Sequence, residues 1–360
     1  MSPLNPWFGF MAASIAAGRG AFDVMAHLVE GHGIKQATSA DHARTWATRH
    51  VVRRELTTMR VLEFSNGLDG ATAIVVAPFA LHAATTSDFA RSHSVVEALL
   101  RNGVTRLFLT DWRSAGAAER YLSIDSYLAD LNVLVDDVGA PAALVGLCQG
   151  GWLATAYTAR FPAKVSRLAL VGAPIDIEAG RSAISDIIKL TTSEMVDELV
   201  ALGDGLLLGH VMMAMWPMAH PAKDDITEIL QLESRKHGAA LTGLHERFCK
   251  WDTDLVDLPG VFYLQTSEWV FRENRLAKGA FVALGNRIEL KAVHCPLYLL
   301  AAEEDEIVPC AQLLAMADLV STPPKLVTTR IAPGRHLSLF MGQRTLRVHW
   351  PAIAGFLTVG

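Results

Sequence analysis

The stretch "AALVGLCQGGWLATAYTARFP" (142–162) decides the fold. Its first six residues are apolar and predict a buried strand, and its second half predicts a helix. The turn between them holds Cys148, with Gly146, Gly150 and Gly151 around it. Small residues let a strand and a helix approach closely, and such a strained turn presents its central side chain as a nucleophile. The alternative interpretation is a buried, unreactive thiol.

Strand-like and helix-like segments alternate around this turn. The expected strands are 72–79, 104–112, 142–147, 165–172, 295–302 and 325–332, and the expected helices include 92–101, 123–139 and 149–160. This alternation predicts an α/β protein with a mostly parallel, doubly wound sheet and helices on both of its faces.

The alternation is interrupted once, which suggests three parts. Residues 1–55 are expected to form an N-terminal helical segment, and residues 56–176 together with 291–360 the α/β core. Residues 177–290 contain no convincing strand and are expected to form a helical cap over the active-site end of the sheet. The Met/Trp-rich part of this cap (211–218) either lines a hydrophobic acyl channel or is ordinary core.

The loops after two later strands supply partners for the thiol. An acid and then a histidine should follow the nucleophile in the chain, each after a core strand. Asp305 and His336 stand at these two places, His336 as general base and Asp305 as the group that orients it. The competing acids are Glu303, Glu304 and Glu306, and the less well placed histidines are His294 and His349.

The same turn also predicts an oxyanion hole. The backbone N–H of Gln149 lies at the start of the helix, where a developing negative charge would be stabilised. The second donor is expected from the loop after an earlier strand, at the backbone N–H of Phe79 or Ala80.

Composition excludes several other classes of function. The 360-residue chain is 51% hydrophobic and carries a formal net charge of −5, so a nucleic-acid partner is not expected. Its four cysteines contain no C-x-x-C pair, which favours a reducing cytoplasm, and no histidine pattern indicates a metal site. The N-terminal apolar run stops at Arg19, too short to span a membrane, and no positive charge precedes it as in a signal peptide. No cofactor is expected.

The turn around Cys148 and several other stretches of the chain resemble poly(3-hydroxyalkanoate) synthases, whose nucleophile turn has Cys in place of Ser. The turn itself carries the resemblance, as do "RSHSVVEALLRNGVTRLFLTDWRSA" (91–115), "KWDTDLVDLPG" (250–260), "ELKAVHCPLYLLAAEEDEIVP" (289–309) and "GRHLSLF" (334–340). The similarity covers about residues 60–350. It implies an α/β-hydrolase fold and the catalytic residues Cys148, Asp305 and His336. Secondary site residues would be His82, Trp251 and Asp252.

The chain departs from the synthase pattern at three positions. Synthases usually have Asn at the place of His82, His at the place of Glu306, and Gly at the place of Arg335. Other segments, such as "APFALH" (77–82) and "FYLQTSEWVFRENRLAKG" (262–279), resemble intracellular polyhydroxyalkanoate depolymerases, which also use a Cys nucleophile.

The sequence therefore supports three hypotheses of function. The leading one is an acyltransferase resembling polyhydroxyalkanoate synthase, which polymerises 3-hydroxyacyl-CoA through an acyl group on Cys148. The second is a depolymerase or thioesterase with the same three residues, and the third is a non-catalytic, granule-associated homologue. The partners expected are 3-hydroxyacyl-CoA or the polymer chain, and the granule surface. A homodimer is the common default.

Overall fold

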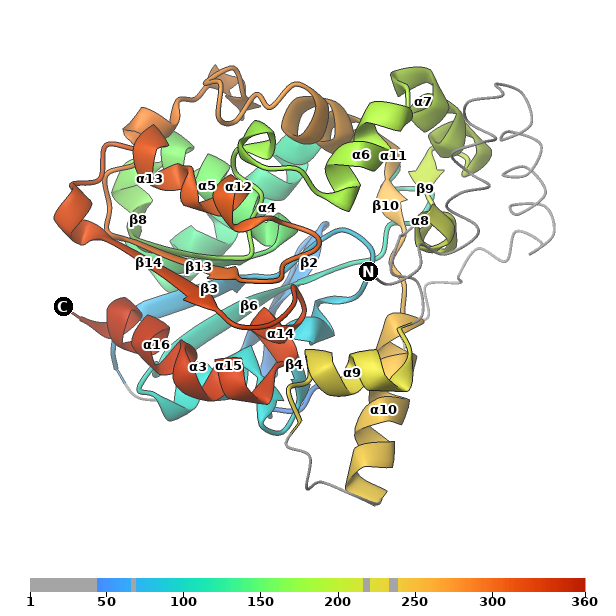
Figure 1. Cartoon of the computed structure of the whole chain (residues 1–360). Helices are drawn as coiled ribbons and strands as arrows, with labels where there is room; N and C mark the ends of the chain where they lie inside the picture. The colour runs from blue at the N-terminus through green and yellow to red at the C-terminus, as the bar shows by residue number, and fades with distance from the viewer. Residues whose placement is uncertain (1–43, 66–68, 216–220, 233–238, 360) are drawn as a thin grey trace.

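The computed structural model describes residues 44–65, 69–215, 221–232 and 239–359 (Figure 1). Most of the expected N-terminal helical segment, residues 1–43, lies outside these residues. Its last part is a strand, β1 (Val51–Glu55), which corrects the expectation of a helix there. All five side chains of β1 are exposed at the edge of the sheet, where charged residues are typical of strands that are paired on one side only.

One sheet of eight strands forms the centre of the protein, in the order β1-β2-β6-β3-β7-β8-β13-β14. The strands after β1 are β2 (Met59–Glu63), β3 (Thr72–Val76), β6 (Arg106–Trp112), β7 (Ala142–Leu147), β8 (Val165–Val171), β13 (Leu297–Ala302) and β14 (Val327–Ala332). The pairs β1–β2 and β2–β6 are antiparallel, and every other pair is parallel. The mostly parallel sheet predicted from the sequence is confirmed.

Helices cover both faces of this sheet (Figure 1). On one face lie α3 (Val95–Arg101), α15 (Gln343–Val348) and α16 (Trp350–Thr358), and on the other α4 (Ile124–Val138), α5 (Gln149–Arg160), α12 (Cys310–Leu314) and α13 (Met316–Leu319). The short helix α14 (Ser338–Met341) follows the loop after β14, and a small antiparallel pair joins β4 (Asp88–Ala90) to β5 (His93–Ser94).

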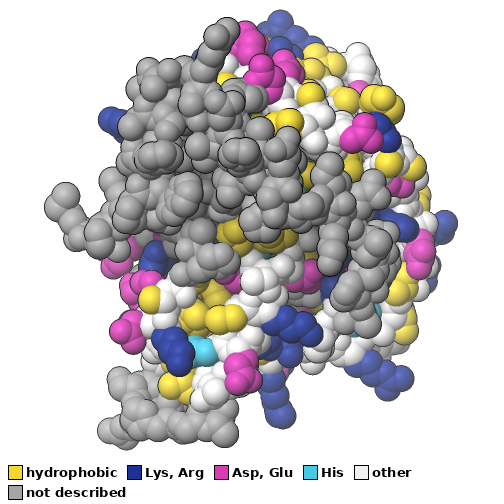
Figure 2. Space-filling model, turned by 90° about the vertical axis from the view of Figure 1, so that its right-hand side faces the viewer, with side chains coloured by type: hydrophobic (Ala, Val, Ile, Leu, Met, Phe, Trp, Pro, Cys, Tyr) yellow, Lys and Arg dark blue, Asp and Glu magenta, His cyan; other side chains and the backbone are white. Residues whose placement is uncertain are grey.

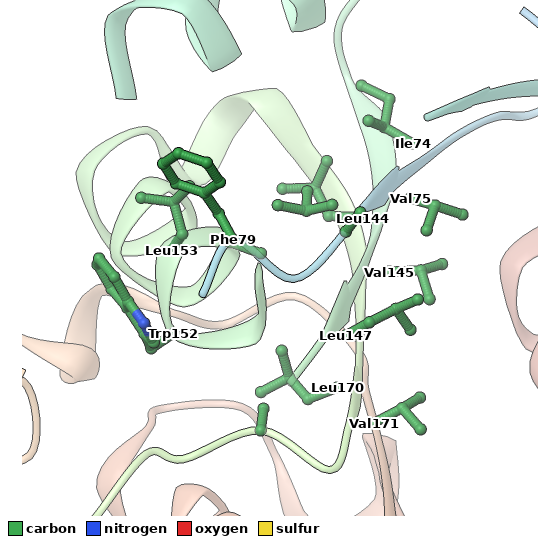
Figure 3. Packing of buried hydrophobic residues seen from close by; sticks show 14 of the residues in the cluster. Ile74, Val75, Phe79, Leu144, Val145, Leu147, Trp152, Leu153, Leu170 and Val171 are labelled. Atoms are coloured by element: carbon green, nitrogen blue, oxygen red, sulfur yellow. The ribbon is translucent and has the colours of Figure 1, made fainter. Parts of the chain in front are cut away.

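Alternating side chains of the central strands fill the core on both sides of the sheet. In Figure 3, Leu144 and Leu170 point toward Leu153 of α5, whereas Val145 and Val171 point to the opposite face. All five are at most 2% exposed. Continuous apolar strands of this kind are expected where helices bury both faces of a parallel sheet.

The segment between β8 and β13 is mainly helical. Its helices are α6 (Ala183–Leu190), α7 (Ser193–Leu202), α8 (Gly209–Met215), α9 (Lys223–Ile229), α10 (Ala239–Asp252), α11 (Gly260–Gln265) and the π-helix Thr266–Arg272. It also contains two-residue strands, the pair β9 (Leu206–Leu207) with β10 (Leu258–Pro259) and the pair β11 (Val282–Ala283) with β12 (Asn286–Arg287), which the sequence did not indicate. We call this segment the cap.

Several side chains tie the cap to the core. Asn274, in the left-handed region with φ 55°, is buried; its amide donates to the Asp176 carboxylate at 2.7 Å and accepts from the Ile177 N–H at 3.3 Å. The Asp176 N–H in turn donates to a backbone carbonyl of the core helix α12 at 3.0 Å. Two residues after α9, the Gln231 amide donates to the Pro333 carbonyl at 2.9 Å and accepts from the Thr345 N–H at 2.8 Å, so it connects the cap with the loop after β14 and with α15.

The helices α8, α9 and α10 lie on the right-hand side of Figure 1, and Figure 2 shows this side as a surface. On its described part, Lys and Arg side chains are mixed with Asp and Glu side chains.

Candidate active site

Cys148 occupies a strained turn between β7 and α5. Its backbone has φ 46° and ψ −120°, a conformation that residues other than Gly rarely adopt. Its N–H donates to the Val171 carbonyl at 3.0 Å, and its carbonyl accepts from the Gly151 N–H at 2.8 Å. The two hydrogen bonds hold the turn from both sides, and the half-buried thiol is displayed at the start of α5.

Each glycine of the turn has a steric reason. A Cβ atom on Gly146 would lie 2.5 Å from the Gly151 Cα, and one on Gly151 would lie 2.2 Å from the Ala173 Cβ. A Cβ atom on Gly150 would lie 2.1 Å from the Val76 carbonyl oxygen, at the end of β3. All three distances are far below van der Waals contact, so only glycine lets α5 pack this closely against the neighbouring strands.

His336 and Asp305 lie together in the loops after β14 and β13. The His336 Nδ1 atom is 2.9 and 2.8 Å from the two carboxylate oxygens of Asp305. The same carboxylate accepts hydrogen bonds from the N–H groups of Ile307 and Val308, at 3.0 and 2.7 Å. Because a carboxylate only accepts, Nδ1 carries the proton, and the carboxylate fixes the orientation of the ring.

The free nitrogen of His336 lies at the thiol. Nε2 is buried and close to the Cys148 sulfur, but the two atoms do not meet in hydrogen-bond geometry. Burial lowers the pKa of His336, but the Asp305 carboxylate and the Cys148 sulfur together outweigh it and raise that pKa well above its ordinary value. An imidazole in this environment can accept the thiol proton and keep it.

The other acids and histidines predicted as competitors do not take this place. Glu303 and Glu304 are exposed, and so is His294. His349 is half-buried, and burial lowers its pKa. None of these four residues lines the cavity around the Cys148 thiol, which we call the reaction chamber.

Glu306 has a position that the sequence did not indicate. Its carboxylate accepts from the backbone N–H of His336 at 3.1 Å and lies 3.4 Å from the Arg335 Nε. Arg335 in turn lies 3.3 Å from the Asp225 carboxylate of α9. Two of the three departures from the synthase pattern are therefore ion-paired neighbours beside His336. Their opposite charges at positions 306 and 335 were the only available signal in the sequence.

The expected oxyanion residues border the thiol. Ala80 and Gln149 line the same chamber as Cys148. The Gln149 side chain accepts from the Trp152 indole N–H at 2.6 Å, which anchors this residue. Phe79 is buried, with its ring centroid 4.9 Å from that of Tyr127, and its side chain fixes the loop after β3. Their role as oxyanion donors stays a prediction.

The three secondary residues form one group at the chamber. The His82 ring stacks on Trp251 with centroids 4.3 Å apart. Its Nε2 atom lies 3.1 Å from the Asp252 carbonyl oxygen and 3.4 Å from the carboxylate of the same residue. His82 and Trp251 also line the chamber. The structure thus joins the loop after β3 to the end of α10 at this point.

The reaction chamber holds about 760 Å³ of empty space including its opening to solvent, and its lining includes Cys148, Gln149 and His336. Most of the remaining lining is apolar, with Pro174, Ile307, Val308, Leu337 and Phe340 among its members. An apolar chamber with a few polar groups at one place is typical of sites for small, largely hydrophobic ligands.

The described residues contain no group of three or more His, Cys, Asp or Glu side chains arranged to hold a metal ion. Within the same part of the chain, no helix has both the length and the apolar character needed to cross a bilayer.

Comparison with known proteins supports the fold and the resemblance. Residues 81–343 match the model of the α/β hydrolase fold family. The chain belongs to this family. The chain is 16% identical to a monoacylglycerol lipase of Paleococcus ferrophilus, with a TM-score of 0.52 over 80% of this chain and 95% of the lipase. At that identity the likeness shows the fold alone.

Two curated relatives carry the same name, poly(3-hydroxyalkanoate) polymerase subunit PhaC. The protein from Synechocystis sp. is 29% identical over 286 residues, which cover 75% of this chain and 73% of the relative. The protein from Haloferax mediterranei is 25% identical over 289 residues, which cover 74% of this chain and 54% of the relative. The resemblance to the polyhydroxyalkanoate synthase group is thereby confirmed.

Proposed function

We propose that this protein is an acyltransferase that forms an acyl thioester on Cys148 and passes the acyl group to a hydroxyl. The observation that carries the proposal is the buried Asp305–His336 pair beside a thiol held in a strained turn. The names of the PhaC relatives support a hydroxyacyl substrate. The proposed substrate is a 3-hydroxyacyl-CoA, and the proposed acceptor is the hydroxyl end of a poly(3-hydroxyalkanoate) chain.

In the first half-reaction, His336 Nε2 takes the proton of the Cys148 thiol. The sulfur attacks the thioester carbonyl, and the oxyanion receives hydrogen bonds from the backbone N–H of Gln149 and of Phe79 or Ala80. The carbon–sulfur bond to coenzyme A then breaks. The leaving thiolate takes the proton from His336, so that free coenzyme A and an acyl-Cys148 remain.

In the second half-reaction, His336 takes the proton of the acceptor hydroxyl, whose oxygen attacks the acyl-Cys148 carbonyl. The carbon–sulfur bond breaks, the Cys148 sulfur recovers the proton, and an ester is formed. Conversion of a thioester to an ester is downhill, which favours a thiol nucleophile for this transfer. The proposed steps use the side chains of the three site residues and the backbone N–H donors, and none of them calls for a cofactor.

Hydrolysis differs only in the second acceptor. If water replaces the hydroxyl, the same three residues make a depolymerase or a thioesterase. An inert site would make the chain a granule-associated homologue. The four free cysteines fit a cytoplasmic location for any of the three, and association with the polymer granule belongs to the same proposal.

The test is incubation with 3-hydroxybutyryl-CoA and, separately, with polymer granules. We expect release of coenzyme A with growth of polymer. Coenzyme A release with only free acid would instead show a thioesterase, and soluble 3-hydroxy acid from granules would show a depolymerase. Cys148→Ala should abolish turnover, and Cys249→Ala, which changes an exposed thiol outside the chamber, should not. Undiminished turnover by Cys148→Ala would refute the proposed nucleophile.

A further inference from the structure

A second chamber adjoins the reaction chamber. It holds about 730 Å³ of empty space including its opening, and the two chambers share Ala80, Gln149 and Phe271. The second chamber contains neither Cys148 nor His336, and it lies beneath the cap. Its other lining residues are Phe79, Ile187, Ile188, Met212, Leu258, Phe262, Tyr263, Thr266 and Ser267.

A π-helix forms the wall between the two chambers. The helix α11 runs directly into the π-helix Thr266–Arg272, which gives Thr266 and Ser267 to the second chamber and Phe271 to both. π-Helices are rare and frequently occur at functional sites. The buried Asn274 anchors the end of this segment to the core, so the wall is held in place relative to Cys148.

The lining of the second chamber is neutral. It combines aliphatic and aromatic side chains with three hydroxyl groups, those of Tyr263, Thr266 and Ser267, and the described part of the lining includes no charged residue. Thr266 is 6% exposed, and its Oγ1 atom has no hydrogen-bond partner among the described residues. A buried polar atom without a partner is costly, and a ligand oxygen could satisfy this one once the Thr266 side chain turns toward the chamber that it lines. The described lining offers no cation to the phosphates of coenzyme A, which favours a neutral ligand here.

The shared residues set the direction of a bound acyl group. If the reacting carbonyl oxygen lies at the backbone N–H of Gln149 and Ala80, the atoms beyond that carbonyl are already at the opening of the second chamber. We propose that the second chamber binds the neutral chain of the acyl group beyond the reacting carbonyl, with Thr266 donating a hydrogen bond to an oxygen of that chain. This inference rests on the proposed function and extends it to the substrate.

The chemistry is shared by two sources of chain. One is a long alkyl group, which would use only the apolar walls. The other is an ester-linked hydroxyacyl unit, which also offers a carbonyl oxygen to Thr266. Rates of Cys148 acylation by acetyl-CoA, by hexanoyl-CoA and by the coenzyme A thioester of a linear 3-hydroxybutyrate dimer separate the two, with intact-protein mass spectrometry as the readout.

Ser267→Leu adds bulk inside the second chamber. We expect it to lower the hexanoyl-to-acetyl and dimer-to-acetyl rate ratios by about ten-fold or more, because a few methylene groups lose their site. Met212→Phe fills the chamber from another wall and should do the same, which keeps the test open if one variant does not fold. Ala201→Leu adds bulk at an exposed residue of the cap helix α7, outside both chambers, and should leave the ratios unchanged.

Thr266→Val removes the hydroxyl and keeps the shape. We expect the dimer-to-hexanoyl ratio to fall about five-fold, the size of one lost hydrogen bond. Ratios that stay at wild-type values in folded Ser267→Leu and Met212→Phe proteins would overturn the inference, as would an equal ratio change in Ala201→Leu. Failure of the proposed function gives different results. If Cys148 is not the nucleophile, none of the three thioesters acylates it in the wild-type protein; if water is the acceptor, the rate ratios are unaffected and free acid appears in place of polymer in the coenzyme A release assay.

Discussion

Gly150→Ala is the sharpest test of the steric basis of the nucleophile turn. The new Cβ atom would lie 2.1 Å from the Val76 carbonyl oxygen and 2.5 Å from that of Ala77. Both neighbours are backbone atoms, so the end of β3 and the start of α5 must separate by about 1 Å to restore van der Waals contact. The loop that carries Phe79 and Ala80 begins at this point, and it would move with β3.

Two magnitudes follow for Gly150→Ala. Overpacking should lower the free energy of unfolding by about 1–3 kcal/mol. A displacement of this size at an oxyanion donor should slow acylation of Cys148 by roughly 100-fold. The assays are urea unfolding and single-turnover acylation by 3-hydroxybutyryl-CoA.

Gly243→Ala is the matched control. Gly243 also lies within a helix, α10, but a Cβ atom there would meet nothing within 4 Å. This variant should gain up to about 1 kcal/mol of stability from helix propensity, with an unchanged acylation rate. If Gly150→Ala matched Gly243→Ala in both assays, the steric explanation of the turn would be wrong.

Three other predictions concern the groups around the thiol. Iodoacetamide should alkylate Cys148 well before Cys295, because burial raises the pKa of Cys295 to about 11; equal rates would argue against an activated thiol. Glu306→Ala should slow acylation about ten-fold and Glu306→Gln much less, because Gln still accepts from the His336 N–H; equal losses would exclude this positioning role. The raised pKa of His336 stabilises the fold most below the unfolded pKa of about 6.5, and this contribution declines as the pH rises toward the folded pKa. Asp305→Asn should therefore reduce the free energy of unfolding more at pH 6 than at pH 9. A loss that does not depend on pH in urea titrations would contradict this prediction.

The strand–turn–helix unit and the order of the three site residues could be predicted from the sequence. Both depend on local signals, namely the apolar run before Cys148, the small residues around it, and loops that follow apolar strands. The strand β1 was missed because "VVRRE" shows no alternation of apolar and polar residues, and all five of its side chains are exposed at the edge of the sheet. β3 ends at Val76 rather than residue 79, because the chain turns there to form the loop beside Cys148.

Contacts that depend on how distant segments dock could not be predicted. Glu306 was expected only as a competing acid, yet its partner is a backbone N–H thirty positions away. Met212 lies in the stretch 211–218, for which both a channel and a core interpretation were open. The structure puts Met212 on the second chamber and buries Met213, while residues 216–218 lie outside the described chain. The π-helix has no sequence signature of its own, since it arises where the turns of an α-helix widen to accommodate an extra residue.

The hydrogen bonds of Gln231 to the C-terminal part of the core limit how far the cap can be exchanged as a unit. One side chain after α9 holds both the Pro333 carbonyl before His336 and the Thr345 N–H behind it. A chimaera that replaced the whole cap by that of a relative would cut this connection and free the His336 loop, although every core strand was retained. Recombination boundaries should therefore keep α9 and Gln231 with the C-terminal half of the core, and exchange only the helices that line the second chamber.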